Sequence, residues 1–272
     1  MEAFFNFGER LPAVRRLGLA TRGNTHLTQD DICLALQAGI NYWNWCGHED
    51  GMAAAIRKLG SCRSDVMIAI QLEAREKESA GRELENRLNQ LKTDYIDVVT
   101  FYYVEHAEEW QDIIGDRGAL LAMRAAQQQG LVRLIGLTTH QRSIAMEALR
   151  SRHLDLLMVR YNAAHRSAET SIFPVAQEFQ TPVVTFTSLR WTALLQATPD
   201  DPRGFKPQRA AEWYRLVLSN PAVAVALMAP DSREELKDNL TLLADWRAPT
   251  QQERETLLLH GERVRRHAGR FP

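Results

Sequence analysis

The chain has 272 residues, and its 33 Lys plus Arg against 34 Asp plus Glu give a net charge of −1. This balance argues against nucleic acid or an anionic membrane surface as the main partner, because both are bound through a basic face. The longest apolar runs, such as residues 222–229, are far shorter than the roughly 18 residues that a membrane span needs.

The N-terminus and the cysteines indicate a compartment. An acid stands at position 2, no basic n-region follows, and the three cysteines form no CxxC pair. These features argue against a secretory signal and favour reduced thiols in a cytoplasmic protein. Hydrophobic residues make up 45% of the chain and charged residues 25%, values typical of a globular protein. We expect one domain over residues 1–272.

Short apolar runs alternate along the chain with longer stretches of helical period. The runs predicted as strands are residues 17–21, 40–46, 66–72, 95–104, 132–138, 154–161, 183–189 and 222–228. The predicted helices with defined bounds are residues 28–38, 52–59, 120–129, 143–149, 172–179, 210–218 and 251–267. Two further helices are predicted, one from the apolar stripe Leu84, Leu88 and Leu91 and one from the cap Ser232.

Eight such β-then-α units predict an α/β fold with a parallel sheet. Several strands are apolar throughout, which is typical of strands buried on both faces under helices. The length and the repeat fit a closed (β/α)8 TIM barrel with short mouth loops and a C-terminal helix. A doubly wound open sheet is the competing arrangement, but no GxGxxG follows the first strand. In such barrels the active site lies where the strands end.

Several side chains at the predicted strand ends could carry acid–base chemistry. Tyr102 offers a proton, Glu73 a carboxylate, and Glu105 with His106 an acid–base pair. The competing interpretations are an aromatic wall for Tyr102, a local ion pair with Arg75 for Glu73, and a solvated loop for the segment EHAEEW.

Cys46 and His48 form a C-x-H on a strand-end loop, and His106 or Glu49 could complete a metal site. One short spacing does not predict a metal, and a bystander thiol is favoured over a nucleophile. No metal is expected.

Aromatic residues cluster near the same strand ends and predict a mouth suited to a flat or apolar small ligand. They are Trp43, Trp45, Tyr102, Tyr103 and Phe186. Because side chains alternate along a strand, Trp43 and Tyr103 are expected to point outward instead.

Six segments, in order, resemble the aldo-keto reductase family. They are ALQAGINYWNWCGHEDG, LNQLKTDYIDVVTFYYV, GLVRLIGLTTH, VRYNAAHRSAE, VVTFTSLRWTALL and NPAVAVALMAPDSREELKDNL. The resemblance implies a barrel that binds NADP(H) at its mouth and transfers hydride to a carbonyl. A Tyr would act as the acid, tuned by an Asp, a Lys and a His.

At the positions of that catalytic set the sequence departs from the family. The Asp position reads Asn44, the Lys position Gln71 and the His position Tyr102. The loop that should carry the Tyr is shortened, and His48 or Glu49 is merely nearest. The resemblance therefore implies the scaffold, whereas ordinary Tyr-driven carbonyl reduction is not expected.

The cofactor positions are altered as well. Thr138 and Thr139 replace the Ser-Asn pair that holds the carboxamide, Met158 replaces a Gln, and Phe186, followed by Thr187, replaces the ring-stacking Tyr.

Near the expected phosphate, Asp231 would repel an anion. Arg233 and the helix end at Ser232 would attract one. NADP binding is expected to be weak.

These residues predict a divergent small-molecule enzyme, an oxidoreductase by family. The alternatives are a non-redox enzyme, such as an isomerase, lyase or cyclase, in the same mouth, or a catalytically silent binding protein. The expected partner is a small molecule, with the oligomeric state left open.

Overall fold

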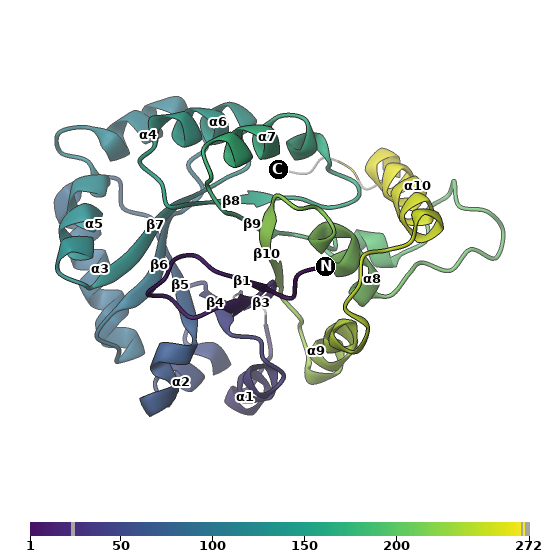
Figure 1. The fold of residues 1–272 in the computed structure, drawn as a ribbon, viewed down its shortest axis with the longest axis horizontal. Coiled ribbons are helices and arrows are strands. Elements are labelled where there is room, and N and C mark those ends of the chain that lie inside the picture. The colour runs from purple at the N-terminus through teal and green to yellow at the C-terminus, as the bar shows by residue number, and fades with distance from the viewer. Residues whose placement is uncertain (23–24, 268, 270–272) are drawn as a thin grey trace.

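The computed structural model describes residues 1–22, 25–267 and 269. Parallel strands close into a barrel in the order β10-β3-β4-β5-β6-β7-β8-β9, which confirms the predicted (β/α)8 fold (Figure 1). The strands are β3 (Leu17–Ala20), β4 (Tyr42–Trp45), β5 (Met67–Leu72), β6 (Ile96–Phe101), β7 (Val132–Thr139), β8 (Leu156–Arg160), β9 (Val183–Phe186) and β10 (Val223–Met228).

Helices surround the barrel (Figure 1). They are α1 (Gln29–Gln37), α2 (Gly51–Ile56), α3 (Lys77–Leu91), α4 (Ala107–Ile114), α5 (Ala119–Gln128), α6 (Arg142–Ser151), α7 (Ile172–Glu178), α8 (Ala210–Leu218), α9 (Arg233–Leu240) and α10 (Gln251–His267). Short 3-10 helices span Gly60–Asp65, Ser167–Glu169, Ala193–Leu195 and Thr241–Asp245. No helix in these described ranges is long and apolar enough to cross a membrane.

The prediction of a solvated loop for EHAEEW is wrong from Ala107 onward, where α4 begins. Glu109 accepts hydrogen bonds from the backbone N–H groups of Glu105 and His106, which would otherwise be unsatisfied at the helix start. Trp110 and Ile113 bury the inner face of α4. The charged residues of the segment EHAEEW therefore include the first turn of a short amphipathic helix.

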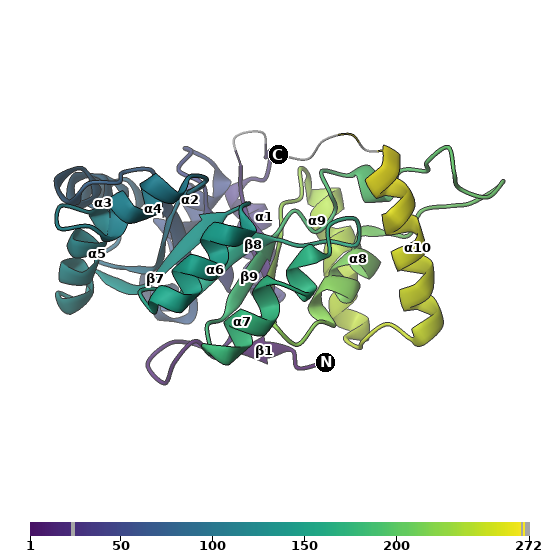
Figure 2. The same ribbon diagram turned by 90° about the horizontal axis from the view of Figure 1, so that it is seen from above.

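A hairpin of β1 (Phe4–Phe5) and β2 (Val14–Arg15) precedes the barrel and was not predicted from the sequence. Figure 2 shows β1 below the barrel, at the end where the strands begin. Phe7 packs against Tyr42 inside the barrel, with ring centroids 6.0 Å apart. The hairpin therefore closes the end of the barrel opposite the mouth.

Alternate residues of each strand fill the barrel interior. Its buried cluster includes Tyr42, Met67, Val98, Leu156 and Val225. This packing leaves the mouth as the open end, and it fixes which strand-end side chains point into it.

A buried ion cluster joins the starts of β5, β6 and β7. The Asp97 carboxylate is fully buried and contacts the guanidinium groups of Arg63 at 2.8 Å and Arg133 at 3.1 Å. It also accepts a hydrogen bond from the backbone N–H of Ile68 at 2.9 Å. This cluster lies at the N-terminal ends of the strands, so it stabilises the barrel and does not belong to the mouth.

Candidate functional site

A pocket of about 950 Å³ opens at the C-terminal ends of the strands. It brings together most of the residues that the sequence singled out: Asn44, His48, Gln71, Glu73, Tyr102, Thr138, Met158, Phe186 and Thr187. They come from β4 to β9 and the loops that follow. The prediction that Gln71, Tyr102 and Met158 share one mouth is confirmed.

Three buried polar atoms of residues that line the pocket lack partners. Asn44 and Thr138 are each 1% exposed, and Ser188 is 2% exposed. Asn44 Oδ1, Thr138 Oγ1 and Ser188 Oγ accept or donate no hydrogen bond within the described residues. Buried polar atoms in native proteins are nearly always hydrogen-bonded, so these three favour a ligand that supplies the missing contacts.

Tyr102 and Tyr103 both line the pocket, which contradicts the expected outward position of Tyr103. They follow the last residue of β6, and Tyr103 adopts a left-handed φ of 42° that ends the strand alternation. Their rings stack with centroids 4.0 Å apart. Burial raises the pKa of both phenols, so both stay protonated at neutral pH.

Both tryptophans lie outside the mouth: Trp43 points outward as expected, whereas the expectation that Trp45 lines the mouth is wrong. Trp43 and Trp45 are both fully buried in the cluster between the barrel and its helices. Trp45 Nε1 donates to the His48 carbonyl at 2.7 Å and so fixes the start of the loop after β4. The aromatic wall of the pocket consists instead of Tyr102, Tyr103, Phe186 and Trp191, and Tyr214 of α8 also lines the pocket.

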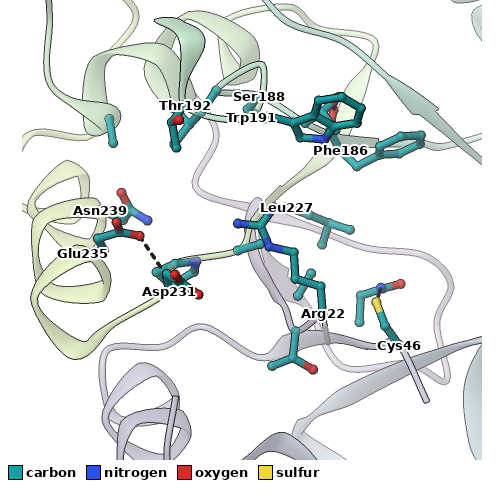
Figure 3. A pocket seen from close by; sticks show the side chains of 18 of the residues that line it. Arg22, Cys46, Phe186, Ser188, Trp191, Thr192, Leu227, Asp231, Glu235 and Asn239 are labelled. Atoms are coloured by element: carbon teal, nitrogen blue, oxygen red, sulfur yellow. Dashed lines mark hydrogen bonds between the residues drawn. The ribbon is translucent and has the colours of Figure 1, made fainter. Parts of the chain in front are cut away.

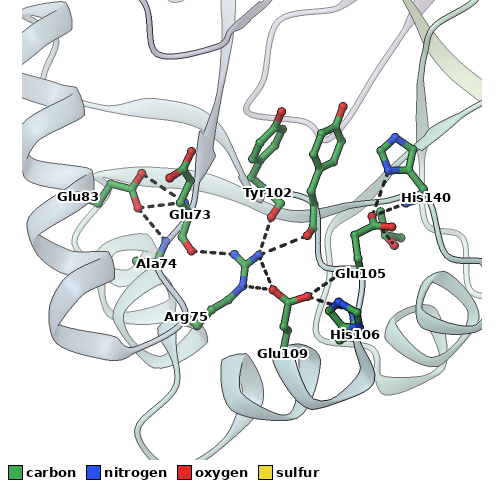
Figure 4. A network of polar contacts seen from close by, with 11 residues as sticks. Glu73, Ala74, Arg75, Glu83, Tyr102, Glu105, His106, Glu109 and His140 are labelled. Carbon is green, nitrogen blue, oxygen red and sulfur yellow. Dashed lines mark hydrogen bonds and ion pairs between the residues drawn. The ribbon is translucent and has the colours of Figure 1, made fainter. Parts of the chain in front are cut away.

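The Glu73 carboxylate lines the pocket without the predicted ion pair to Arg75. Arg75 contacts Glu109 at 3.2 Å and donates to the backbone carbonyls of Glu73 and Tyr102 (Figure 4). Glu83 accepts hydrogen bonds from the Glu73 and Ala74 backbone N–H groups. Within the described residues, no hydrogen bond or ion pair occupies the Glu73 carboxylate itself. Arg75 therefore holds the strand-end loops together and leaves Glu73 available at the mouth.

The expected Glu105–His106 pair does not form. Glu105 instead contacts His140, with 3.2 Å between Oε1 and Nδ1, and also accepts from the His140 backbone N–H at 2.8 Å. His106 is exposed, precedes α4 and does not line the pocket (Figure 4). The His140 ring lies behind Tyr103, with centroids 4.5 Å apart. The pair therefore supports the aromatic wall from outside the pocket.

Cys46 lines the pocket, but the structure does not make it a nucleophile. Burial raises the pKa of its thiol to about 12, so the reactive thiolate is scarce at neutral pH. Asn44 Nδ2 donates to its sulfur at 3.4 Å. In the part of the chain that the structure describes, no three His, Cys, Asp or Glu side chains gather as they would around a metal ion.

Two other sequence candidates do not line the pocket. Glu49 is exposed and pairs with Arg57 at 2.5 Å, in the loop after β4. Thr139 is buried, and its Oγ1 accepts from the Gln141 backbone N–H at 2.9 Å. Of the predicted Thr138–Thr139 pair, only Thr138 faces the pocket, because neighbouring strand residues point to opposite sides.

Opposite the aromatic wall, β10 and α9 form another wall of the pocket (Figure 3). Asp231 precedes α9, its Oδ1 is buried without a hydrogen-bond partner among the described residues, and its backbone N–H donates to Glu235 at 2.8 Å. Ser232 caps α9 by accepting from the Glu235 N–H at 3.2 Å, and Arg233 pairs with Asp31. Ser232 and Arg233 do not line the pocket, so their anion-binding groups are used within the protein.

Many further lining residues were not predicted from the sequence, among them Arg22, Trp191 and Glu235. Each of these three follows β3, β9 or β10 in a loop or in the next helix, so the rule that barrel sites lie beyond strand ends could have found them. Trp191 belongs to residues 187–209, which form the long connection between β9 and α8. This connection departs from the prediction of short loops at the mouth.

Asp201 anchors this long connection to α10. Its carboxylate is 2% exposed, contacts Arg263, lies 3.1 Å from His260 Nδ1, and accepts from the Thr198 N–H. Burial opposes the ionisation of Asp201, but the hydrogen bonds from Thr198, His260 and Arg263 outweigh it and lower its pKa to about 2. This anchor positions the segment that carries Trp191.

Asp201→Asn is expected to lower the free energy of unfolding by about 3 kcal/mol, because it leaves the Arg263 cation beside a neutral amide. Since the pKa of Asp201 is lowered on folding, its stabilisation is complete above about pH 4 and is lost as the pH falls toward 2. Urea unfolding at neutral pH measures the change. Asp200→Asn, which removes a neighbouring exposed carboxylate, is the matched control. Equal stability of the two variants would contradict the anchoring role.

Comparisons with known proteins agree with this geometry. The model of the Aldo/keto reductase family matches residues 17–235. The holo and apo structures of aldo-keto reductase AKR11C1 from Bacillus halodurans match with TM-scores of 0.77 and 0.75 at 18% identity, covering 96% of each chain. An aldo/keto reductase from Brucella melitensis matches with a TM-score of 0.70 at 14% identity, covering 94% of this chain and 98% of that one. No curated protein matches the sequence.

Proposed function

The chain belongs to the aldo/keto reductase family, and we propose that it is a divergent small-molecule enzyme in which standard NADPH-dependent carbonyl reduction is largely lost. The observation that carries this proposal is the surrounding of Tyr102. Tyr102 is a phenol on the aromatic wall of the mouth whose pKa is raised by burial, and in the described part of the chain no lysine lines the pocket. Such a phenol is a weak proton donor.

The other positions of the implied catalytic set support the same proposal. Asn44 and Gln71 carry amides where the family resemblance implies a carboxylate and a cation. Both line the pocket near Tyr102, and neither carries a charge that would lower the phenol pKa. The loop over residues 46–50 has no tyrosine. We propose that these residues orient a ligand by hydrogen bonds and do not tune an acid.

The half of the pocket near Phe186 fits a flat ring with a hydrogen-bonding group. Phe186 is 8% exposed and offers an aromatic face, and Thr138 Oγ1 is buried without a hydrogen-bond partner among the described residues. Met158 lines the same region but offers no amide. A nicotinamide or a ring of similar size would find part of its contacts here.

The half toward α9 does not fit the phosphates of NADP. Asp231, Glu234 and Glu235 line it, whereas Ser232 and Arg233 are held by partners within the protein. A phosphate there would meet these carboxylates, and among the described lining residues Arg22 is the one cation without an ion pair to receive it. We propose that the NADP site is eroded in this half and that any NADPH binding is weak.

A non-redox reaction is the second candidate, and the Glu73 carboxylate favours it. Glu73 is exposed at the pocket edge, and no ion pair or hydrogen bond to its carboxylate occurs within the described residues. An unpaired carboxylate beside a ligand pocket can accept a proton as a general base. Such a reaction would need Glu73 but no nicotinamide cofactor.

Thermal unfolding with and without nucleotide tests the proposal. Millimolar NADPH or NADH is expected to raise the melting temperature by at most about 3 °C, because a weak ligand stabilises the native state only slightly by mass action. ADP serves as the control for contacts that do not involve the nicotinamide. A rise of about 10 °C with NADPH alone would contradict the proposed erosion.

A further inference from the structure

The wall of the pocket at α9 is rich in acids. Asp231, Glu234, Glu235 and Asp238 all line it. Arg209 pairs with Asp238, which cancels one of these charges. With Arg22 and Arg209 both counted against the four acids, this half of the pocket keeps a net negative charge. Its acids are held on a helix and the turn before it, so the charge has a fixed place.

Arg22 also enters the pocket but does not neutralise these acids by direct contact (Figure 3). Among the described residues, Arg22 makes no ion pair, and its Nε is buried without a hydrogen-bond partner. Asp231 Oδ1 is likewise buried and unpartnered. A buried carboxylate oxygen without a partner is costly, so Asp231 favours a ligand that brings a donor to it.

Aromatic rings face the acids across the pocket. Figure 3 shows Trp191 and Phe186 along one side and Asp231 and Glu235 on the other. Trp191 is 52% exposed and Phe186 is 8% exposed. Aromatic faces attract cations through the ring quadrupole, and the attraction strengthens where water is excluded. The acidic wall therefore favours a positively charged nitrogen, and the aromatic wall opposite favours the flat body that carries it.

Three buried polar side chains of the pocket provide an independent indication of a ligand. Asn44, Thr138 and Ser188 are at least nine-tenths buried, and each has an unpartnered polar atom at the pocket. These neutral groups suit a hydrogen-bonding substituent and require no charge. The pocket thus offers neutral polar contacts from these side chains and negative charge at its α9 wall.

We infer that the mouth takes a small cationic amine with a flat body, whose ammonium group lies between Asp231 and Glu235 and whose body packs against Phe186 and Trp191. The inference deepens the proposed function, because it rests on the α9 half of the pocket not being filled by phosphate. The inference assigns the α9 half of the pocket to the binding of a cation instead of a phosphate.

Three probes of similar size and different charge test the inference: 2-phenylethylamine, 2-phenylethanol and 3-phenylpropionate. Calorimetric titration at low salt is expected to give the amine a dissociation constant about tenfold or more below that of the acid, with the alcohol between them. Raising the salt to about 1 M should reduce the preference for the amine, because exposed charges such as that of Glu235 are screened.

The double variant Asp231→Asn with Glu235→Gln is expected to bring the affinities for the amine and the alcohol together. Both substitutions keep the side-chain size. The amide introduced at position 235 retains an oxygen that can accept from the backbone N–H of residue 231, so circular dichroism should show an intact fold. Asp116→Asn with Glu178→Gln removes the same charge from exposed sites outside the pocket and is the matched control.

The inference is overturned if the acid binds as tightly as the amine, if the amine does not bind at about 10 mM, or if the pocket variant keeps the wild-type preference for the amine. A parallel NADPH titration separates this inference from the proposed function. Tight NADPH binding would contradict the proposed function. Absence of both amine and NADPH binding would overturn only the assignment of the cation.

Discussion

With NADPH as the reductant, the purified protein is expected to reduce generic aldehydes about 10²–10⁴-fold more slowly than an aldo-keto reductase with the complete Asp, Tyr, Lys and His set. This range is the usual contribution of a positioned general acid. Tyr102 is a phenol on the aromatic wall of the mouth, and burial raises its pKa while Gln71 supplies no positive charge. The measurement is the decrease in NADPH absorbance with a panel of small aldehydes.

Two variants control this experiment. Tyr102→Phe should change the low residual rate little, because Tyr102 is a poor acid in this surrounding. Glu49→Gln should also have little effect, because Glu49 pairs with Arg57 outside the pocket. Robust turnover that survives both substitutions would show that another group supplies the proton, and it would contradict the proposed loss of carbonyl reduction.

The second large expected effect is a loss of affinity for NADPH. Met158 provides no amide for the carboxamide, and leaving a buried polar group without its partner costs about 1–3 kcal/mol. Asp231 adds repulsion where a phosphate would lie, in place of a charge-assisted contact. Since each 1.4 kcal/mol is about tenfold, the two changes together are expected to weaken NADPH binding about a hundredfold.

The barrel could be predicted from the sequence because its strands are continuous apolar runs. Residues 66–72 and 222–228 were predicted within one residue of β5 and β10. The family resemblance placed Gln71 and Met158 at the mouth, and side-chain alternation put Gln71 on the same side of its strand as Glu73. These are local properties of the chain.

The remainder of the site depends on contacts between distant segments. Glu105 pairs with His140, which lies beyond β7, and not with its neighbour His106. Arg233 is held by Asp31 across the join between the last and first helices of the barrel. Tyr103 turns into the mouth because its left-handed φ ends the alternation just beyond β6. No periodicity in the sequence encodes such pairings or a single unusual dihedral angle.

Calorimetric titration of the wild-type protein with NADPH tests the central claim most directly. We expect a dissociation constant of tens of micromolar or weaker, and we expect Met158→Gln combined with Asp231→Arg to tighten it by restoring an amide and a cation at the two altered positions. A submicromolar dissociation constant for the wild-type protein would contradict the account, because the acidic α9 wall would then have to accommodate the phosphates without loss of affinity.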